Sequence, residues 1–298
     1  MPSAKYASAL VRIALPIALR RFIRYLSVLF TLPSLFTSLS SFPTGSNPPP
    51  FAFAVFSPLF LSPSYGSRAT VFVSDINEKH INKLKKNSKI NKKLFVFNCD
   101  ASDEYQVNEL FEKIKKKTSK IDCLINNVGI AGPTATLENI STDDWENTMK
   151  VNVFSHYYFT RLAIPMLKKN RGGSIINISS GAGIMGFPLR SPYSASKWAI
   201  VGMTKTLSME LGKFKIRVNA LCPGTIKGDR MIRVAKDKAK LLKISKKSIE
   251  KEFISMASMN CWIYESDIGK MCGFLISDDA ARVSGQVIGV DGDAIRLH

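Results

Sequence analysis

The sequence has few of the residues that build disulfide frameworks or metal sites. Its 298 residues include 5 cysteines and 3 histidines, with no CxxC pair and wide gaps between the histidines. The thiols are therefore predicted to be reduced core residues in a reducing compartment, and no metal ion is expected. The residues concerned are Cys99, Cys123, Cys222, Cys261 and Cys272, with His80, His156 and His298.

Acidic residues are absent from the first 74 positions, which contain several arginines and are rich in Ser, Leu, Phe and Pro. From Asp75 onward the chain is rich in lysine and asparagine instead. This change in composition predicts an atypical, poorly ordered leader over residues 1–68 and one folded domain over residues 69–298. A hydrophobic content of 45% is ample for the core of that domain.

Positive charge is in surplus, with a formal net charge of +19, but it is scattered along the chain. A run such as KLKKNSKINKK, residues 83–93, falls at a predicted helix end, where a solvated surface is the usual interpretation. No nucleic-acid-reading motif accompanies the charge. We therefore predict no nucleic-acid partner and expect no membrane partner.

Apolar strands alternate with amphipathic helices from residue 71 to residue 290, which predicts an α/β fold. Such alternation specifies a doubly wound parallel sheet, covered by helices on both faces, with ligands at the carboxyl ends of the strands. The expected strands are 71–74, 94–98, 122–126, 174–179, 216–221 and 286–290, and the expected helices are 77–86, 103–117, 142–169, 192–212 and 265–277.

Three polar residues stand in the run SIINISSGAGIMGFPLRSPYSASKWAI, residues 174–200, at a spacing that indicates redox chemistry. Tyr193 and Lys197 are at i and i+4 of a predicted helix, so the ammonium can reach the phenol. A nearby cation favours the phenolate, whose pKa is about 10 in model peptides. Ser180 ends the preceding strand, where its hydroxyl can hold a carbonyl oxygen. Together they predict a site for interconverting a carbonyl and an alcohol.

This constellation resembles the short-chain dehydrogenase/reductase family over residues 69–291. The family pattern is a serine followed by YxxxK, with an upstream asparagine that helps to relay protons; Asn152, in MKVNVFSHYYF, occupies that position. The resemblance implies a Rossmann-like fold and a catalytic set of Asn152, Ser180, Tyr193 and Lys197. It is strongest toward 3-oxoacyl-acyl-carrier-protein reductases and related 3-hydroxyacyl or polyol dehydrogenases.

The resemblance also implies a nicotinamide cofactor. Asp75 ends the strand ATVFVSD, where a carboxylate accepts hydrogen bonds from the adenosine ribose and repels a 2′-phosphate, so NAD is expected over NADP. Asp100 occupies the place that usually contacts the adenine amino group. Further cofactor-binding residues implied by the motifs INNVG and ALCPGTI are Asn126, Gly129, Pro223, Gly224, Thr225 and Ile226, together with Tyr193 and Lys197.

A glycine-rich phosphate loop is missing from its usual place. The family opens with a strand, a TGxxxGIG turn and a helix whose N-terminus receives the pyrophosphate. The segment NPPPFAFAVFSP, about 20 residues before Asp75 as that fingerprint spaces them, has no glycine, although residues 51–56 can be drawn as a strand. The first strand, glycine loop and first helix are therefore predicted to be missing or degraded. A non-catalytic remnant unable to bind dinucleotide is the alternative function.

Three interpretations remain open for the leader. It resembles an organelle transit peptide, which would place the enzyme in an organelle matrix rather than in the cytoplasm, our first expectation. LSVLFTLPSLFTSL can be drawn as a signal or anchor, but Pro33 interrupts it. We favour the third, a wrong start or frame error that replaced the family's first elements.

A cluster of basic residues follows Pro223, in the segment that covers the substrate in this family. A basic cover suits an acyl thioester on phosphopantetheine, coenzyme A or an acidic carrier protein, although an exposed basic helix pair is an equal alternative. The resemblance also implies a homo-oligomer, a tetramer or a dimer. The basic residues are Lys227, Arg230, Arg233, Lys236, Lys238, Lys240, Lys243, Lys246 and Lys247.

Overall fold

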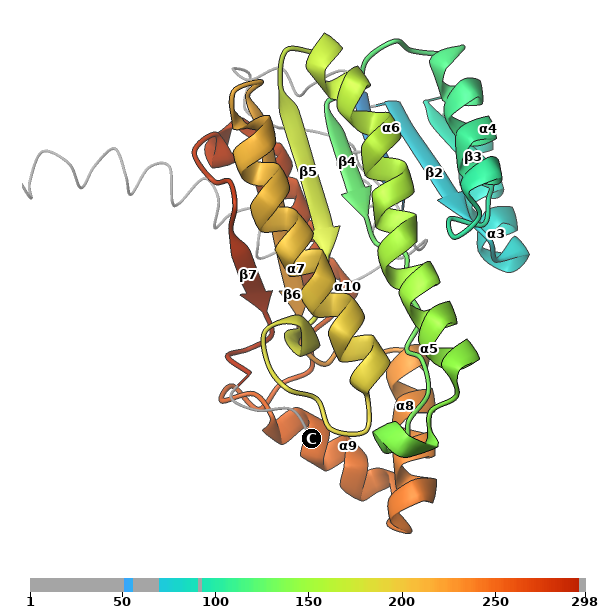
Figure 1. The fold of residues 1–298 in the computed structure, drawn as a ribbon, viewed down its shortest axis with the longest axis vertical. Coiled ribbons are helices and arrows are strands. Elements are labelled where there is room, and N and C mark those ends of the chain that lie inside the picture. Colours follow the sequence, from blue (N-terminus) through green and yellow to red (C-terminus); the bar gives the residue numbers. More distant parts are fainter. Residues whose placement is uncertain (1–50, 56–69, 91–92, 295–298) are drawn as a thin grey trace, which may run out of the picture. The chain divides into compact units, whose positions relative to one another are not determined.

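The protein's structure, a computed structural model, describes residues 51–55, 70–90 and 93–294 (Figure 1). Its centre is a seven-stranded sheet of order β3-β2-β1-β4-β5-β6-β7 in which each neighbouring pair is parallel. The predicted parallel α/β architecture is confirmed. The strands are β1 (Phe51–Val55), β2 (Thr70–Asp75), β3 (Leu94–Asn98), β4 (Cys123–Asn126), β5 (Gly173–Ile178), β6 (Ile216–Pro223) and β7 (Val287–Val290).

Strand β1 lies in the middle of the sheet, between β2 and β4. Its residues pair in register with both neighbours, as in Phe53 opposite Phe72 and Leu124. The prediction that the first strand is missing or degraded stays a prediction, although the apolar segment Phe51–Val55 pairs with both β2 and β4. The glycine loop and first helix, which are predicted to be missing or degraded, would fall in residues 56–69, outside the described residues. All interpretations of the leader up to residue 50 lie outside them too.

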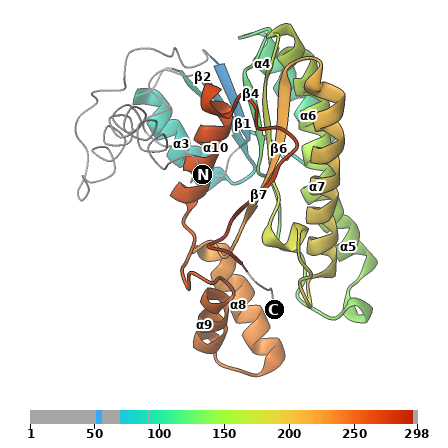
Figure 2. The same ribbon diagram turned by 90° about the vertical axis from the view of Figure 1, so that its left-hand side faces the viewer.

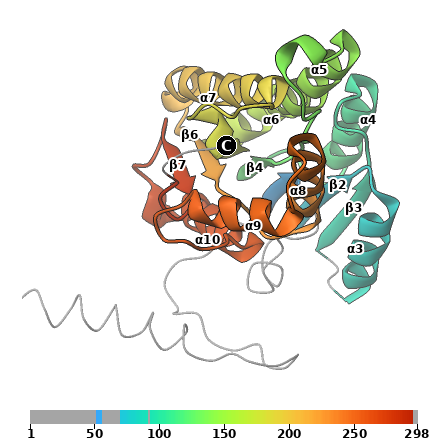
Figure 3. The same cartoon turned by 90° about the horizontal axis from the view of Figure 1, so that it is seen from below.

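Helices cover both faces of the sheet, as the alternation predicted. They are α3 (Glu78–Ile90), α4 (Glu104–Lys115), α5 (Thr142–Met149), α6 (Ser155–Lys169), α7 (Ser191–Gly212), α8 (Asp229–Leu242), α9 (Lys246–Ser255) and α10 (Glu265–Ile276). Figure 3 shows α4, α6 and α7 on one side and α3 and α10 on the other. Within the described residues no helix has the length and apolar character needed to cross a membrane.

Side chains of successive strand residues enter two different cores, as the period of two in a strand requires. Phe72, Leu124 and Ile175 pack in the core beneath α4, α6 and α7. Their neighbours Val73 and Ile176 pack in the core beneath α3 and α10. Both faces are apolar because both are covered, which explains the continuous apolar runs in the sequence.

One feature departs from the predicted elements. The helix expected over residues 142–169 is interrupted by a π-helical turn, Lys150–Phe154, between α5 and α6. The basic segment after Pro223 forms the helix pair α8 and α9, which Figure 2 shows beyond the carboxyl ends of the strands. This pair, called the lid below, has its own small core that includes Val234, Ile249 and Phe253.

Candidate active site

Two segments distant in the sequence are tied together at the carboxyl end of β5. Ser179 donates a hydrogen bond from Oγ to the Lys197 carbonyl at 2.8 Å, and Ser194 donates from Oγ to the Ala182 carbonyl at 2.8 Å. Between them, Ser180 caps a short turn by accepting the Ala182 N–H at 3.2 Å. The serine turn and the first turns of α7 therefore form one unit, as the predicted site requires.

Tyr193 and Lys197 share a face of α7. The Lys197 Nζ atom lies 5.7 Å from the centroid of the Tyr193 ring. Lys197 is only 3% exposed, and its ammonium donates to the Ile178 carbonyl at 3.0 Å. Because burying an ammonium is costly without such partners, this lysine is held at a defined place beside the phenol.

Asn152 lies in the π-helical turn and is fully buried, with 0% exposure. Its Oδ1 accepts the Ile130 N–H at 2.7 Å, and its Nδ2 donates to the Ile130 carbonyl at 3.1 Å and to Ser196 Oγ at 2.9 Å. Ser196 in turn donates to the Tyr193 carbonyl at 2.7 Å. Asn152 thus connects the loop after β4 to the helix of Tyr193, and a π turn is a frequent device at functional sites.

The loop after β4 approaches this group closely. A Cβ atom on Gly129 would lie 3.1 Å from Asn152 Oδ1 and 3.4 Å from Lys197 Nζ, so any side chain there would fill the space above the lysine. Asn126, by contrast, is buried and donates to Thr160 Oγ1 and to Asn177 Oδ1, both at 2.9 Å. Its observed contacts brace the sheet, and its assignment to cofactor binding stays a prediction.

Two carboxylates are predicted to bind the adenosine: Asp75 is the last residue of β2, and Asp100 lies two residues beyond the end of β3. Asp75 Oδ1 accepts the Asn77 N–H at 2.9 Å, and Asp75 Oδ2 lies 3.1 Å from His80 Nδ1. Asp100 Oδ1 accepts from both the N–H and the hydroxyl of Ser102, at 2.8 and 2.7 Å. Both carboxylates are thus oriented by their own loops at the edge where a dinucleotide would lie.

The turn after β6 joins the sheet to the lid. Gly224 has no space for a side chain, because a Cβ atom would lie 2.7 Å from the Asp291 Cα atom. The Thr225 carbonyl accepts the Ile263 N–H at 3.1 Å, and Ile226 forms a bridge with Ile263. Pro223 is the last residue of β6, so all four predicted residues of this turn lie at the same edge as Gly129. The residues present therefore fit a dinucleotide laid across the strand ends.

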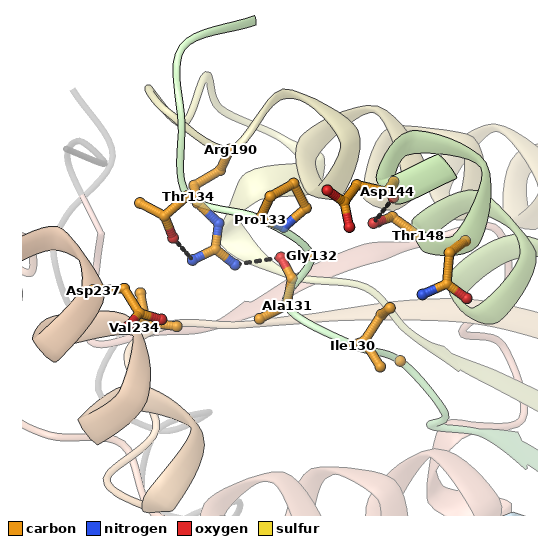
Figure 4. A pocket seen from close by; sticks show the side chains of 12 residues that line it. Ile130, Ala131, Gly132, Pro133, Thr134, Asp144, Thr148, Arg190, Val234 and Asp237 are labelled. Carbon is orange, nitrogen blue, oxygen red and sulfur yellow. Dashed lines mark hydrogen bonds between the residues drawn. The ribbon is translucent and has the colours of Figure 1, made fainter. Parts of the chain in front are cut away.

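A pocket of about 430 Å³ opens beside this group, lined by the loop of residues 129–134, helix α5, Arg190 and helix α8 (Figure 4). Arg190 was not predicted as a site residue, although its place in the mostly uncharged segment GFPLRSP is a signal that the sequence offered. Asp144 and Asp237 also line this pocket. Among the described residues no group of three or more His, Cys, Asp or Glu side chains could hold a metal ion.

His156 is a second residue that sequence reasoning missed. It lies on the first turn of α6, fully buried, with Nε2 3.3 Å from the Val128 carbonyl and no hydrogen-bond partner for Nδ1 among the described residues. Burial, and after it the positive charge of Lys197, lowers the pKa of His156 to about 3. The imidazole is therefore neutral beneath the site.

Comparison with known proteins gives a consistent relationship. A family model described as "Enoyl-(Acyl carrier protein) reductase" matches residues 66–292. A 3-oxoacyl-[acyl-carrier-protein] reductase of Thermotoga maritima is 33% identical over 228 residues, which cover 76% of this chain and 88% of the relative. A 3beta-hydroxysteroid dehydrogenase of Mediterraneibacter gnavus is 32% identical over 209 residues, covering 65% of this chain and 74% of that protein.

Solved structures share the fold at lower identity. Actinorhodin polyketide ketoreductase with NADPH has a TM-score of 0.75 at 22% identity and covers 84% of this chain and 98% of its own. NAD+-bound xylitol dehydrogenase has a TM-score of 0.74 at 23% identity, covering 81% of this chain and 97% of its own. At such identities the likeness establishes the architecture.

Proposed function

Because this chain belongs to the short-chain dehydrogenase/reductase family of NAD(P)-dependent oxidoreductases, we propose that its site interconverts a secondary alcohol and a ketone. One observation carries the proposal. The Ser180 turn is hydrogen-bonded to the first turns of α7, where the buried Lys197 ammonium lies 5.7 Å from the Tyr193 ring centroid. This arrangement suits acid-base chemistry at one carbonyl oxygen.

The proposed roles follow from these positions. In the reductive direction Tyr193 donates a proton to the developing alkoxide, and Ser180 hydrogen-bonds the same oxygen. Lys197 stabilises the phenolate and holds the nicotinamide ribose. The Asn152 Nδ2 atom donates both of its hydrogens to protein groups. A relay water would therefore donate to an oxygen atom of Asn152. The nicotinamide, when bound, supplies or accepts the hydride.

The proposed cofactor is NAD. Asp75 ends β2 with its carboxylate oriented by Asn77 and by His80. A carboxylate there hydrogen-bonds a ribose diol and repels a 2′-phosphate. The similar solved structures include both an NAD+ and an NADPH complex, so they do not favour either cofactor. The proposed preference for NAD over NADP is therefore based on Asp75.

The proposed substrate is a 3-oxoacyl thioester. The lid carries exposed lysines, which include Lys236, Lys240 and Lys247. Such a surface suits an acidic carrier protein or the phosphates of coenzyme A. Lys238 does not belong to it, because it is buried and paired with Glu252 at 3.0 Å. The Thermotoga maritima relative, named for a 3-oxoacyl substrate, supports this choice.

We further propose a homo-oligomer. Phe154, Tyr157 and Trp198 expose 47%, 46% and 50% of their surface at the start of α6 and along α7. Helices α6 and α7 cover the same side of the sheet (Figure 3), and exposed large aromatic side chains are typical of an interaction surface. Light scattering of the purified protein measures the assembly directly.

The competing proposal is a non-catalytic member of the family. It is supported by the sequence NPPPFAFAVFSP, which has no glycine to cradle a pyrophosphate. Loss of that site removes much of the binding energy that positions the nicotinamide.

One experiment separates these proposals. NADH and NADPH binding is followed by fluorescence, and reduction of an acetoacetyl thioester by the loss of NADH absorbance. Tyr193→Phe is expected to lower turnover by about 10²–10⁴-fold while leaving NADH binding nearly unchanged. Tyr105→Phe is the control, because Tyr105 is exposed and its hydroxyl donates only to Glu109 among the described hydrogen bonds. Unaltered turnover in Tyr193→Phe refutes the assigned role, and absence of NADH binding supports the non-catalytic alternative.

A further inference from the structure

A buried arginine connects the proposed catalytic helix to the wall of the pocket. Arg190 immediately precedes α7 and is 3% exposed. Its Nη2 donates to the Ala131 carbonyl at 2.5 Å and its Nη1 to Thr134 Oγ1 at 3.4 Å. Figure 4 shows the side chain crossing to the loop of residues 131–134.

The same guanidinium lies against Tyr193. Its Cζ atom is 5.2 Å from the centroid of the Tyr193 ring and 5.6 Å from that of Phe187. The Arg190 carbonyl accepts the Ser194 N–H at 2.9 Å, which anchors the arginine to the first turn of α7. The phenol therefore has two cations near its ring, Arg190 and Lys197.

A second contact strengthens this connection. The Ala135 N–H donates to the Leu189 carbonyl at 3.0 Å, so the segment before α7 bonds the loop through backbone as well as side chain. Leu189 adopts a φ of 64°, which is uncommon for a residue other than glycine. Ala131 also packs against the small core of the lid. The Arg190 side chain thus contacts both Tyr193 and the loop of residues 131–134, and Ala131 of that loop packs against the lid.

We propose that Arg190 is a positioning residue of this enzyme, one that holds the pocket wall of residues 131–135 and the Tyr193 ring in one arrangement; this inference rests on the proposed function. A helix cap does not require an arginine, and burying a guanidinium is costly, so a smaller polar residue would suffice for capping alone. A role in binding an anionic substrate is disfavoured because Asp144 and Asp237 line the same pocket. The planar guanidinium donates to both of its loop partners from fixed positions, a geometry that the single ammonium nitrogen of a lysine reproduces only in part.

The test compares Arg190→Met and Arg190→Lys with a matched control, Arg217→Met. Arg217 is also partly buried and donates to backbone carbonyls, those of Ile276 and Ser277, but it lies near the amino end of β6. Each variant is assayed where its thermal melt shows it to be folded. The readouts are hydrogen exchange in residues 131–135, NADH binding, and kcat and KM for the thioester.

Arg190→Met is expected to accelerate exchange at Ala135 and to lower kcat/KM by about 10²-fold, because small displacements at a reacting centre cost about that much. NADH binding should stay within about threefold, and Arg190→Lys should recover part of kcat/KM. Arg217→Met should lower the melting temperature alone. The proposal is overturned if Arg190→Met matches Arg217→Met in exchange at Ala135 or in kcat/KM. If the wild type has no turnover, the proposed function fails, and the exchange comparison still decides whether Arg190 holds the loop.

Discussion

Replacement of Asn152 by alanine is the sharpest test of how the site is assembled. The amide is fully buried and makes three hydrogen bonds, two with the Ile130 backbone and one with Ser196. The substitution removes all three and leaves the Ile130 N–H and carbonyl without the partner they have in the folded chain. At about 0.5–1.5 kcal/mol for each bond, the expected loss of unfolding free energy is about 2–4 kcal/mol. For a domain of this size that corresponds to roughly 5–15 °C in melting temperature.

Asn219 provides a matched control for this substitution. It is equally buried and also bridges a loop, donating to the Val283 carbonyl at 2.8 Å and accepting the Gln286 N–H at 3.0 Å. Asn219→Ala is expected to cost about 1–3 kcal/mol through the same mechanism. Asn219 lies away from the tyrosine, so its loss should leave turnover per folded molecule unchanged.

The assay pairs urea unfolding with reduction of an acetoacetyl thioester under folding conditions. Both variants should lose stability, and Asn152→Ala alone should lose turnover, by about tenfold or more, because Ile130 and the loop beside Lys197 shift. Equal turnover in the two alanine variants would show that Asn152 acts only in stability. A loss below about 1 kcal/mol for Asn152→Ala would contradict the hydrogen-bond count itself.

Two further predictions concern buried titratable groups. The pKa of His156 is lowered from 6.5 to about 3 in the folded chain, so its contribution to stability is complete above about pH 6.5–7 and is lost as the pH falls toward 3. His156→Gln should therefore remove about 2 kcal/mol of the decline between pH 7 and pH 5, measured by urea unfolding of both proteins; parallel declines would argue against a neutral buried imidazole. Burial raises the pKa of Cys99 and of Cys272 to about 12, with nearby Asp100 and Asp103 adding to the effect on Cys99. Both thiols should resist iodoacetamide at pH 8 until urea unfolds the chain, and rapid native labelling detected by peptide mass spectrometry would contradict this.

Features that depend on local pattern were predictable from the sequence. The strand Leu94–Asn98 has the predicted bounds, and the helix predicted from residue 103 begins with Asp103 as its N-cap, accepting the N–H groups of Tyr105 and Gln106. The i, i+4 spacing of Tyr193 and Lys197 places them on one face. Periodicity and capping depend on residues a few positions apart, so the order of the amino acids was sufficient for them.

Contacts between distant segments were decided by the tertiary structure. The sequence that follows Phe51–Val55 has no glycine-rich motif to mark these residues as a first strand, yet they pair between β2 and β4. The π-helical turn at Asn152, the buried His156 and the bond from Arg190 to Ala131 all depend on which loop packs against which helix. The amino-acid order by itself determined the alternation, the parallel sheet and the serine-tyrosine-lysine group. Packing alone decided what surrounds that group, because a side chain's cost of burial depends on partners that no local pattern specifies.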